Sequence, residues 1–147
     1  MEHSIKVINS MSNYLNCNVI INSPIEKVWD YFTNPTHIVN WYFASEDWHC
    51  PSAINDLKVD GKFSIRMEAK DKSFGFDLEG SYSFVDLNKQ IDYSLADGRK
   101  VSIIFESVND GVKVAEMFEP ENQNPLDLQQ QGWQSILNNF KSYTELN

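Results

Sequence analysis

The sequence places a histidine beside a cysteine at His49 and Cys50, the pair of residue types most suited to covalent or metal chemistry. A thiolate paired with an imidazole could act as a nucleophile or hold a metal ion. Adjacent side chains usually point apart, which disfavours a dyad. The remaining candidate ligands are His3, His37 and Cys17, and they show no paired-cysteine spacing, whereas a zinc site needs three or four ligands. We therefore interpret the pair as structural and predict no metal site and no cofactor.

Carboxylates within segments of alternating apolar and polar residues are the next candidates, because two of them meeting in a cavity could work as acid and base. Glu68, Asp77 and Glu79 alternate with apolar neighbours and are expected on the solvent face. Arg66 is expected to be their solvated partner. Glu116 shares the parity of the apolar side chains around it, which predicts a carboxylate on the apolar face unless a bulge intervenes. Because a buried charge requires a partner or a ligand, Glu116 is a candidate pocket residue.

Nineteen aromatic residues are the strongest signal in the sequence. Large aromatic side chains on inward faces are first of all core residues, but a ligand pocket is lined by the same residue types with a few polar groups. These residues are therefore candidates for both roles. The candidate ligand-binding residues are Trp29, Phe32, Trp41, Phe43, Trp48, Glu116, Trp133, Leu137 and Phe140; no residue is assigned a catalytic role.

The hydrophobic periods predict the elements that position these residues. Residues 14–22 have the composition of a strand. A first helix is predicted with Ser23 as its cap, followed by proline at the first helical position and glutamate at the third. A second short helix is predicted from Pro35, capped by Asn34. Residues 42–52 are aromatic without a clean period and are predicted to form a loop.

From residue 53 onward, alternating segments separated by turn sequences predict an antiparallel meander. After Pro125, with Asn124 as the predicted cap, apolar residues recur at spacings of three, four and seven, typical of an amphipathic helix of about twenty residues. This order of elements is that of an α+β protein in which the helix covers the apolar face of the sheet.

Composition excludes several functional classes. The length of 147 residues suits one domain, predicted over residues 14–147, with residues 1–13 as an N-terminal extension or an extra strand. A net charge of −9 disfavours nucleic-acid and anionic-membrane partners. The sequence has no apolar run long enough to span a bilayer, no visible export signal and no disulfide framework, which predicts a cytoplasmic protein. We expect a monomer or a weak dimer.

Five motifs, read in order, resemble those of one family. They are SPIEKVW (23–29), Asn34-Pro35 with Trp41, FASEDWHCP (43–51), Gly61-Lys62-Phe63 with RMEAKD (66–71), and GWQSILNNFK (132–141). The chain resembles the helix-grip START-like superfamily, also labelled SRPBCC, in its AHSA-type branch of homologues of the activator of the heat shock protein 90 ATPase. The resemblance implies the birch pollen allergen-like fold, a curved antiparallel sheet wrapped around a long C-terminal helix, with two short helices after the first strand.

The resemblance also implies a hydrophobic cavity between sheet and helix, since the superfamily includes lipid carriers, plant hormone and allergen proteins, and polyketide cyclases. Our leading hypothesis is a non-catalytic protein that binds a hydrophobic small molecule or lipid in this cavity. The second is a cyclase- or dehydratase-like enzyme in which Glu116 or His49 moves a proton. The third is a chaperone-related interaction module, although the co-chaperone itself has a separate chaperone-binding domain that a chain of 147 residues is not expected to include.

Overall fold

The structure is a computed structural model that describes residues 13–147. Most of the N-terminal extension predicted over residues 1–13 therefore lies outside the described residues. The elements in chain order are β1 (Leu15–Ile21), α2 (Ile25–Thr33), α3 (Pro35–Ile38), β2 (Trp48–Asn55), β3 (Lys62–Ala69), β4 (Gly75–Asp86), β5 (Gln90–Leu95), β6 (Lys100–Val108), β7 (Gly111–Phe118) and α4 (Leu126–Leu146).

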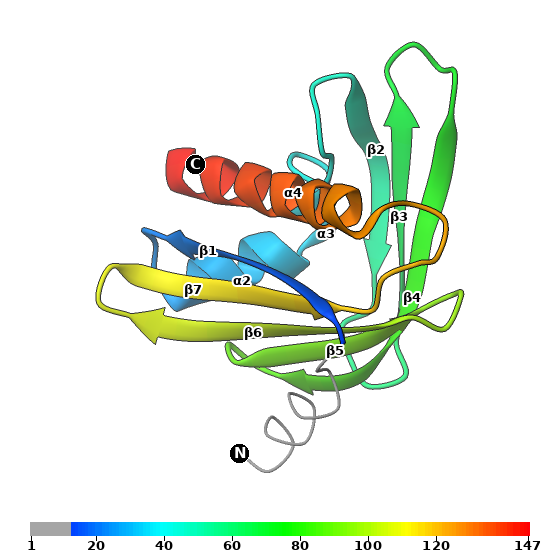
Figure 1. Ribbon diagram of the computed structural model, residues 1–147. Helices are drawn as coiled ribbons and strands as arrows, with labels where there is room; N and C mark the ends of the chain where they lie inside the picture. The colour runs from blue at the N-terminus through cyan, green and yellow to red at the C-terminus, as the bar shows by residue number, and fades with distance from the viewer. Residues whose placement is uncertain (1–12) are drawn as a thin grey trace.

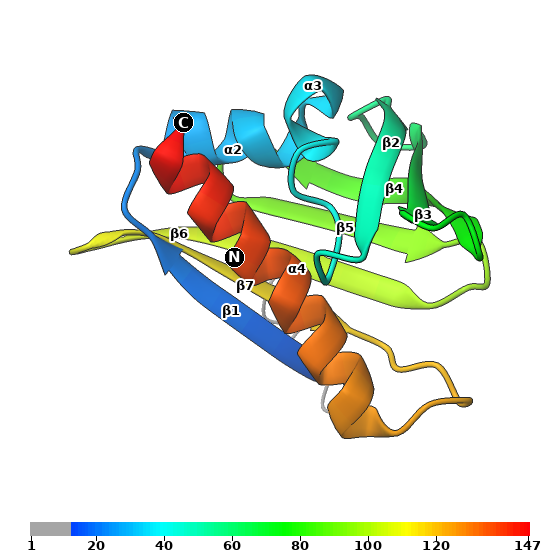
Figure 2. The ribbon, with the colours of Figure 1, turned by 90° about the horizontal axis from the view of Figure 1, so that it is seen from above.

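The strands form one antiparallel sheet in the order β1-β7-β6-β5-β4-β3-β2. The sheet curves strongly, and α4 runs across its concave face, while α2 and α3 lie on the same face beside the C-terminal end of α4 (Figures 1 and 2). The predicted α+β fold, with a curved sheet around a long C-terminal helix and two short helices after the first strand, is confirmed.

Strand β2 corrects the loop predicted over residues 42–52, because the second half of that segment is extended from Trp48 onward. Its register with β3 shifts between His49 and Ser52, at the position of Pro51. Proline lacks a backbone N–H and is tolerated on edge strands and at bulges. The same irregularity removes the alternating pattern by which a strand is recognised from sequence.

The predicted helix caps are correct at one of three sites. The side chain of Asn34 accepts a hydrogen bond from the Thr36 backbone N–H at 3.0 Å, as predicted for α3. The predictions of Ser23 and Asn124 as caps are wrong: the N-cap residues of α2 and α4 are Pro24 and Pro125, and neither helix has a side-chain cap hydrogen bond. Both prolines have non-helical ψ angles, 153° at Pro24 and 144° at Pro125, and each directly precedes the first helical residue. The polar residue before each proline therefore lies one position ahead of the N-cap.

Aromatic packing anchors the C-terminal half of α4. Phe140 is fully buried, and its ring centroid lies 5.1 Å from that of Phe32 and 4.7 Å from that of Trp41. Further toward the start of α4, the ring of Trp133 stacks on Phe118 of β7 with 4.0 Å between centroids and 7° between planes. These contacts hold the helix across the sheet and decide which of its faces meets the strands.

Side chains of α4 also protect the β1 edge of the sheet. An edge strand exposes unpaired backbone groups that invite pairing with another chain. Three long α4 side chains donate hydrogen bonds to β1 carbonyl oxygens: Gln130 to Asn16 at 3.2 Å, Gln134 to Asn18 at 3.0 Å and Lys141 to Ile20 at 2.6 Å. Their spacing of four and seven residues follows the polar face of the helix.

The turn between β6 and β7 sets the register of β7 and offers a test of the fold. Gly111 has a φ of 138°, and a Cβ atom there would overlap the carbonyl oxygen of Ile21. We expect Gly111→Ala to lower the free energy of unfolding by about 2 kcal/mol or more, because backbone strain and overlap add. Gly98→Ala is the matched control, since Gly98 also has a positive φ, of 94°, but open space around it. Urea unfolding that gives equal losses for the two variants would contradict this account of the turn.

Candidate functional site

The concave side of the sheet holds two spaces, a small cavity beneath α2 and α3 and an open groove beside α4. The cavity has a volume of about 30 Å³. A water molecule needs roughly 10–15 Å³ by this measure, so the cavity has room for water but not for an organic ligand. The groove has a volume of about 260 Å³ and is open to solvent. Tyr42 lines both spaces.

The groove is bounded by the first half of α4 on one side and by β3 and β4 on the other. The register of these strands pairs Met67 with Phe76 and Ile65 with Leu78, so the alternation of β3 and β4 directs a row of apolar side chains toward the helix. The groove walls are largely apolar, and the lining residues are Tyr42, Ala44, Met67, Phe76, Leu78, Arg99, Gln129, Gly132, Trp133 and Ile136.

Gly132 keeps the helix side of the groove open. A Cβ atom at this position would meet nothing within 4 Å. Glycine inside a helix costs about 1 kcal/mol relative to alanine, and packing against a neighbour does not explain its presence here. The missing side chain instead leaves space on the surface of α4 between Gln129 and Ile136, both of which line the groove.

Glu116 is buried in the interior, close enough to Tyr42 for its charge to affect the pKa of that tyrosine. Its register position opposite Cys17 in β1 shows no bulge, so the predicted placement on the apolar face is confirmed. The carboxyl group accepts a hydrogen bond from the Cys17 thiol, with 3.3 Å between Sγ and Oε1. Burial raises the pKa of Glu116 to about 7, although the Cys17 hydrogen bond acts in the opposite direction. Glu116 can therefore gain or lose a proton near neutral pH.

Two tyrosines, Tyr42 and Tyr93, lie close enough to this carboxyl group to be affected by its charge. Burial raises the pKa of Tyr42 and of Tyr93 well above the ordinary value, and the charge of Glu116 contributes to both shifts. The Tyr82 hydroxyl donates a hydrogen bond to Asn55. Within residues 13–147 the hydroxyls of Tyr42 and Tyr93 have no hydrogen-bond partner, and both residues line the cavity. The interior therefore offers hydroxyl and carboxyl groups to a polar atom in an otherwise apolar space.

The nine predicted ligand-binding residues fall into separate places. Phe32 lines the cavity, Trp133 lines the groove, and Glu116 lies among the buried polar groups. Phe43 belongs to the segment before β2, where its carbonyl accepts a hydrogen bond from Asn139. Trp48 packs on Phe74 and Phe76 at the β3–β4 end of the sheet. The remaining four are buried core residues: Trp29, Trp41, Leu137 and Phe140.

Sequence reasoning missed the tyrosines of the cavity and the strand residues of the groove. Tyr82 and Tyr93 share the parity of the apolar residues of β4 and β5. A tyrosine on an inward face brings a polar tip into the core, and this was the available signal. Tyr42 follows α3 in a segment without a hydrophobic period. No sequence pattern could therefore predict that its side chain lines both the cavity and the groove.

His49 and Cys50 do not form a dyad. The imidazole of His49 lies 3.8 Å from the Glu68 carboxylate, while the buried Cys50 thiol donates to the Ser52 carbonyl at 3.4 Å.

Arg66 pairs with Glu68 at 2.8 Å and with Asp77 at 3.5 Å, which confirms the predicted solvated ion pairs. Within the described part of the chain, no group of three or more histidine, cysteine or acidic side chains is arranged to hold a metal ion.

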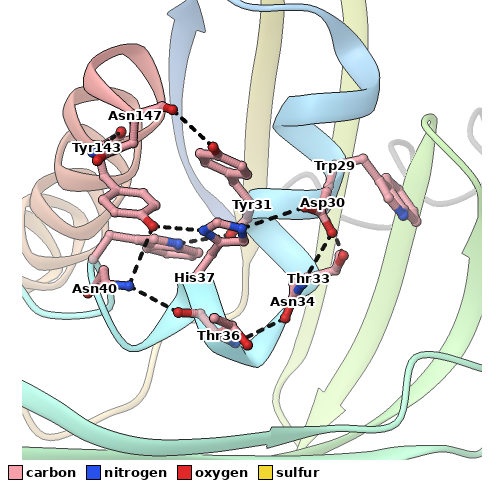
Figure 3. A network of polar contacts seen from close by, with 11 residues as sticks. Trp29, Asp30, Tyr31, Thr33, Asn34, Thr36, His37, Asn40, Tyr143 and Asn147 are labelled. Carbon is pink, nitrogen blue, oxygen red and sulfur yellow. Dashed lines mark hydrogen bonds and ion pairs between the residues drawn. The ribbon is translucent and has the colours of Figure 1, made fainter.

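A polar network holds α3, and with it Tyr42, against α2 and the end of α4 (Figure 3). The Nδ1 atom of His37 lies 2.7 Å from the Tyr143 hydroxyl, its Nε2 atom lies 3.7 Å from Asp30, and its ring stacks on Tyr31 at 3.8 Å. The backbone N–H of Tyr42 then donates to the Ile38 carbonyl at 3.1 Å. We interpret this network as structural, because it fixes the segment that carries Tyr42.

A long helix held in a curved antiparallel sheet, with a groove and buried polar groups between them, defines a helix-grip protein of the START-like superfamily. The family model for Activator of Hsp90 ATPase homolog 1-like protein matches residues 22–145, and the chain belongs to this family. The AHSA-type resemblance of the sequence is therefore confirmed.

Solved structures agree with this assignment. An AHSA1-like protein from Aeromonas hydrophila is 38% identical with a TM-score of 0.85, covering 90% of this chain and 92% of that one. A protein from Cytophaga hutchinsonii is 49% identical with a TM-score of 0.79, covering 92% and 94%. A protein from Nitrosomonas europaea shares the fold at 15% identity, with a TM-score of 0.77 over 90% and 94%. No curated protein matches the sequence significantly.

In the described residues, no helix has the length and apolar character needed to cross a membrane. The cytoplasmic location and the monomeric or weakly dimeric state stay predictions.

The raised pKa of Glu116 predicts a stability that falls as pH rises. The unfolded carboxyl ionises near its ordinary pKa of 4.5 and the folded one at about 7. Between these values the unfolded state binds fewer protons, so the free energy of unfolding decreases through this window and levels off above it. At about 1.4 kcal/mol for each pKa unit, the contribution approaches about 3 kcal/mol.

The measurement is urea unfolding of the wild type and Glu116→Gln at about pH 4.5, 6 and 8. Glutamine keeps an acceptor for the Cys17 thiol but cannot ionise, so its stability should gain on the wild type as pH rises. Glu79→Gln is the control, since Glu79 is exposed on the outer face. A constant difference between Glu116→Gln and the wild type across this range would disprove the assignment.

Proposed function

We propose that this protein binds a small, mostly apolar molecule in the groove between α4 and strands β3 and β4. The observation that carries the proposal is the open apolar groove itself, which has the composition typical of ligand sites. Gly132 on the helix wall supports it, because glycine there weakens the helix and leaves space that packing does not use. A ligand role for Phe43 and Trp48 stays a prediction.

The Tyr42 side chain gives the proposed ligand a polar point of contact in the groove wall. The groove and the cavity share Tyr42 as a wall, and Glu116 lies close enough to that tyrosine to affect its pKa. We therefore expect a ligand with an apolar body and at least one polar group.

The volume of the groove limits the size of the ligand. At about 260 Å³ it lies just below the 300–1,000 Å³ that is usual for pockets binding drug-sized molecules. A medium alkyl chain or a single fused aromatic system suits this space better than a two-chain lipid does. Decanol, which has a C10 chain and one hydroxyl group, is a suitable neutral probe.

Substitutions of Gly132 test the groove directly. We expect Gly132→Phe to fill the groove and weaken decanol binding by about tenfold or more, because the ring would occupy the open space at this position. Gly132→Ala is the matched control, since it adds only a methyl group: it should keep the affinity within about threefold and raise the free energy of unfolding by about 1 kcal/mol. Binding is measured from the NMR shift of the Trp133 indole N–H during titration.

Two results would count against a groove ligand. If decanol leaves the Trp133 indole N–H unchanged, or if Gly132→Phe binds decanol as tightly as the wild type, the proposed site is wrong. The third hypothesis, a chaperone-related interaction module, would then gain support, because it does not require the groove to accept a small molecule.

The pKa of Glu116 favours one alternative, an enzyme that uses the same space. A buried carboxyl group that titrates near neutral pH is suited to general acid–base catalysis, and cyclase and dehydratase reactions require proton transfer at carbon atoms next to a carbonyl. We would incubate the protein with 2-decanone in deuterium oxide and follow loss of the C1 and C3 proton signals by NMR.

An enzyme of this kind should accelerate the exchange, and Glu116→Gln should abolish the acceleration while leaving 2-decanone binding intact. The control is Glu79→Gln, which should exchange at the wild-type rate. Exchange at the buffer rate in the presence of bound 2-decanone would remove the reason to assign proton transfer to Glu116.

A further inference from the structure

Among residues 13–147, Arg99 is the one charged residue that lines the groove. It is also one of only two arginines in the chain, the other being Arg66. Arg99 directly follows the turn between β5 and β6, and about a quarter of its side chain is exposed, at 24%. An otherwise apolar wall therefore ends in a permanent positive charge in a protein whose net charge is −9.

The hydrogen bonds of Arg99 leave the outer part of its guanidinium group available. The Nε atom donates to Asp97 Oδ2 at 2.8 Å, and the backbone N–H donates to Asp97 Oδ1 at 3.1 Å. Within residues 13–147, the two terminal Nη atoms have no hydrogen-bond partner. Two terminal nitrogens in a rigid planar fork can bind both oxygens of a carboxylate.

Arg66 shows the arrangement that a purely structural arginine takes in the same protein. It lies on the outer face of β3, where Nε donates to Glu68 and Nη1 reaches Asp77. Two carboxylates therefore already engage Arg66, whereas Asp97 engages Arg99 only through Nε and the backbone. Arg66 is thus engaged in ion pairs on the outer face of the sheet, whereas within residues 13–147 Arg99 keeps unpaired hydrogen-bond donors at the groove.

Gln129, the groove residue with an amide side chain, is committed to the fold. The Gln129 side chain accepts from the Glu121 backbone N–H at 2.9 Å and donates to the carbonyls of Glu121 and Asn124 at 3.0 and 2.8 Å. These bonds tie the segment before α4 to its first turn and leave Gln129 little capacity for a ligand. Of the two, Arg99 is the residue able to recognise a charged group.

We infer that the groove selects amphipathic anions, namely molecules with a single alkyl or aromatic body that carry a carboxylate, and that Arg99 binds this carboxylate. The inference rests on the proposed function and adds the chemical class of the ligand. The apolar body lies along Met67, Phe76 and Trp133, and the carboxylate lies at the guanidinium group. Such a ligand places charge where the protein has an unsatisfied donor and apolar surface where the protein has an apolar wall.

Two acidic side chains near Arg99 oppose this binding and must be included. Asp97 is about half exposed and already shares the guanidinium group. Glu121 is more weakly coupled: its interaction with Arg99 is the smallest of the contributions that lower the Glu121 pKa, and its oxygens accept from the backbone N–H groups of Gln123 and Asn124. Neither acid lines the groove. Removal of the Asp97 charge should therefore strengthen the binding of an anion.

The test compares three C10 probes that differ in charge: decanoate, decanol and decyltrimethylammonium. Each is titrated below its micelle concentration into the full chain, and the Trp133 indole N–H signal reports binding. For the wild type we expect decyltrimethylammonium to bind most weakly. Arg99→Gln should weaken decanoate binding by about tenfold and change decanol binding by less than about twofold, since only the anion loses a charge-assisted pair of hydrogen bonds.

Two further variants complete the design. Arg66→Gln is the matched control, because it removes the other arginine from the outer face and should leave all three affinities unchanged. Asp97→Asn keeps the Oδ1 acceptor for the Arg99 backbone N–H, removes the competing charge and frees Nε from its bond to Oδ2; it should tighten decanoate binding severalfold. This gain does not depend on whether Arg99→Gln folds well.

The outcomes separate the inference from the proposed function. If decanol binds in the groove but Arg99→Gln and Asp97→Asn leave decanoate affinity unchanged, the groove is a ligand site and the anion selectivity is wrong. If none of the three probes binds, the proposed function itself fails. Equal weakening of decanoate and decanol by Arg99→Gln would assign Arg99 a purely structural role.

Discussion

The packing of α4 on the concave face of the sheet is the constraint on which the other features depend. Its C-terminal half is held by Phe140 in an aromatic cluster with Phe32 and Trp41, and Trp133 adds a stacked contact with Phe118 further toward the start. The first turns lack such an anchor, and leucines there are exposed. A helix tightly held at one end of a curved sheet leaves room at the other, and this is where the groove lies.

The same packing creates the environment of Glu116. Burying a carboxyl group costs free energy unless a partner compensates, and a thiol such as that of Cys17 is a weak donor. Glu116 therefore makes the folded protein less stable at neutral pH than an apolar residue at the same position would make it. Strongly shifted carboxyl groups concentrate at functional sites, and the neighbouring Tyr42 places this one next to a wall of the groove.

Polarity along the site is arranged in three zones. Arg99 supplies a positive charge in the groove, apolar side chains of β3, β4 and α4 form the walls, and the hydroxyl of Tyr42 with the carboxyl of Glu116 lies in the interior. The His37 network holds the segment that carries Tyr42, so the boundary between groove and cavity depends on contacts of α2, α3 and α4. A binder and an enzyme would both use this arrangement, and proton transfer by Glu116 is what distinguishes them.

Alternation and helical period by themselves determined the α+β order, the long C-terminal helix and the inward position of Glu116, because each depends on residues close in sequence. The motifs determined the family for the same reason. Tertiary structure alone decided that Trp48 begins an edge strand and that Phe140 is core while Trp133 faces a groove. These outcomes depend on the curvature of the sheet and the seating of α4 against it, which arise from contacts between distant segments that no local pattern records.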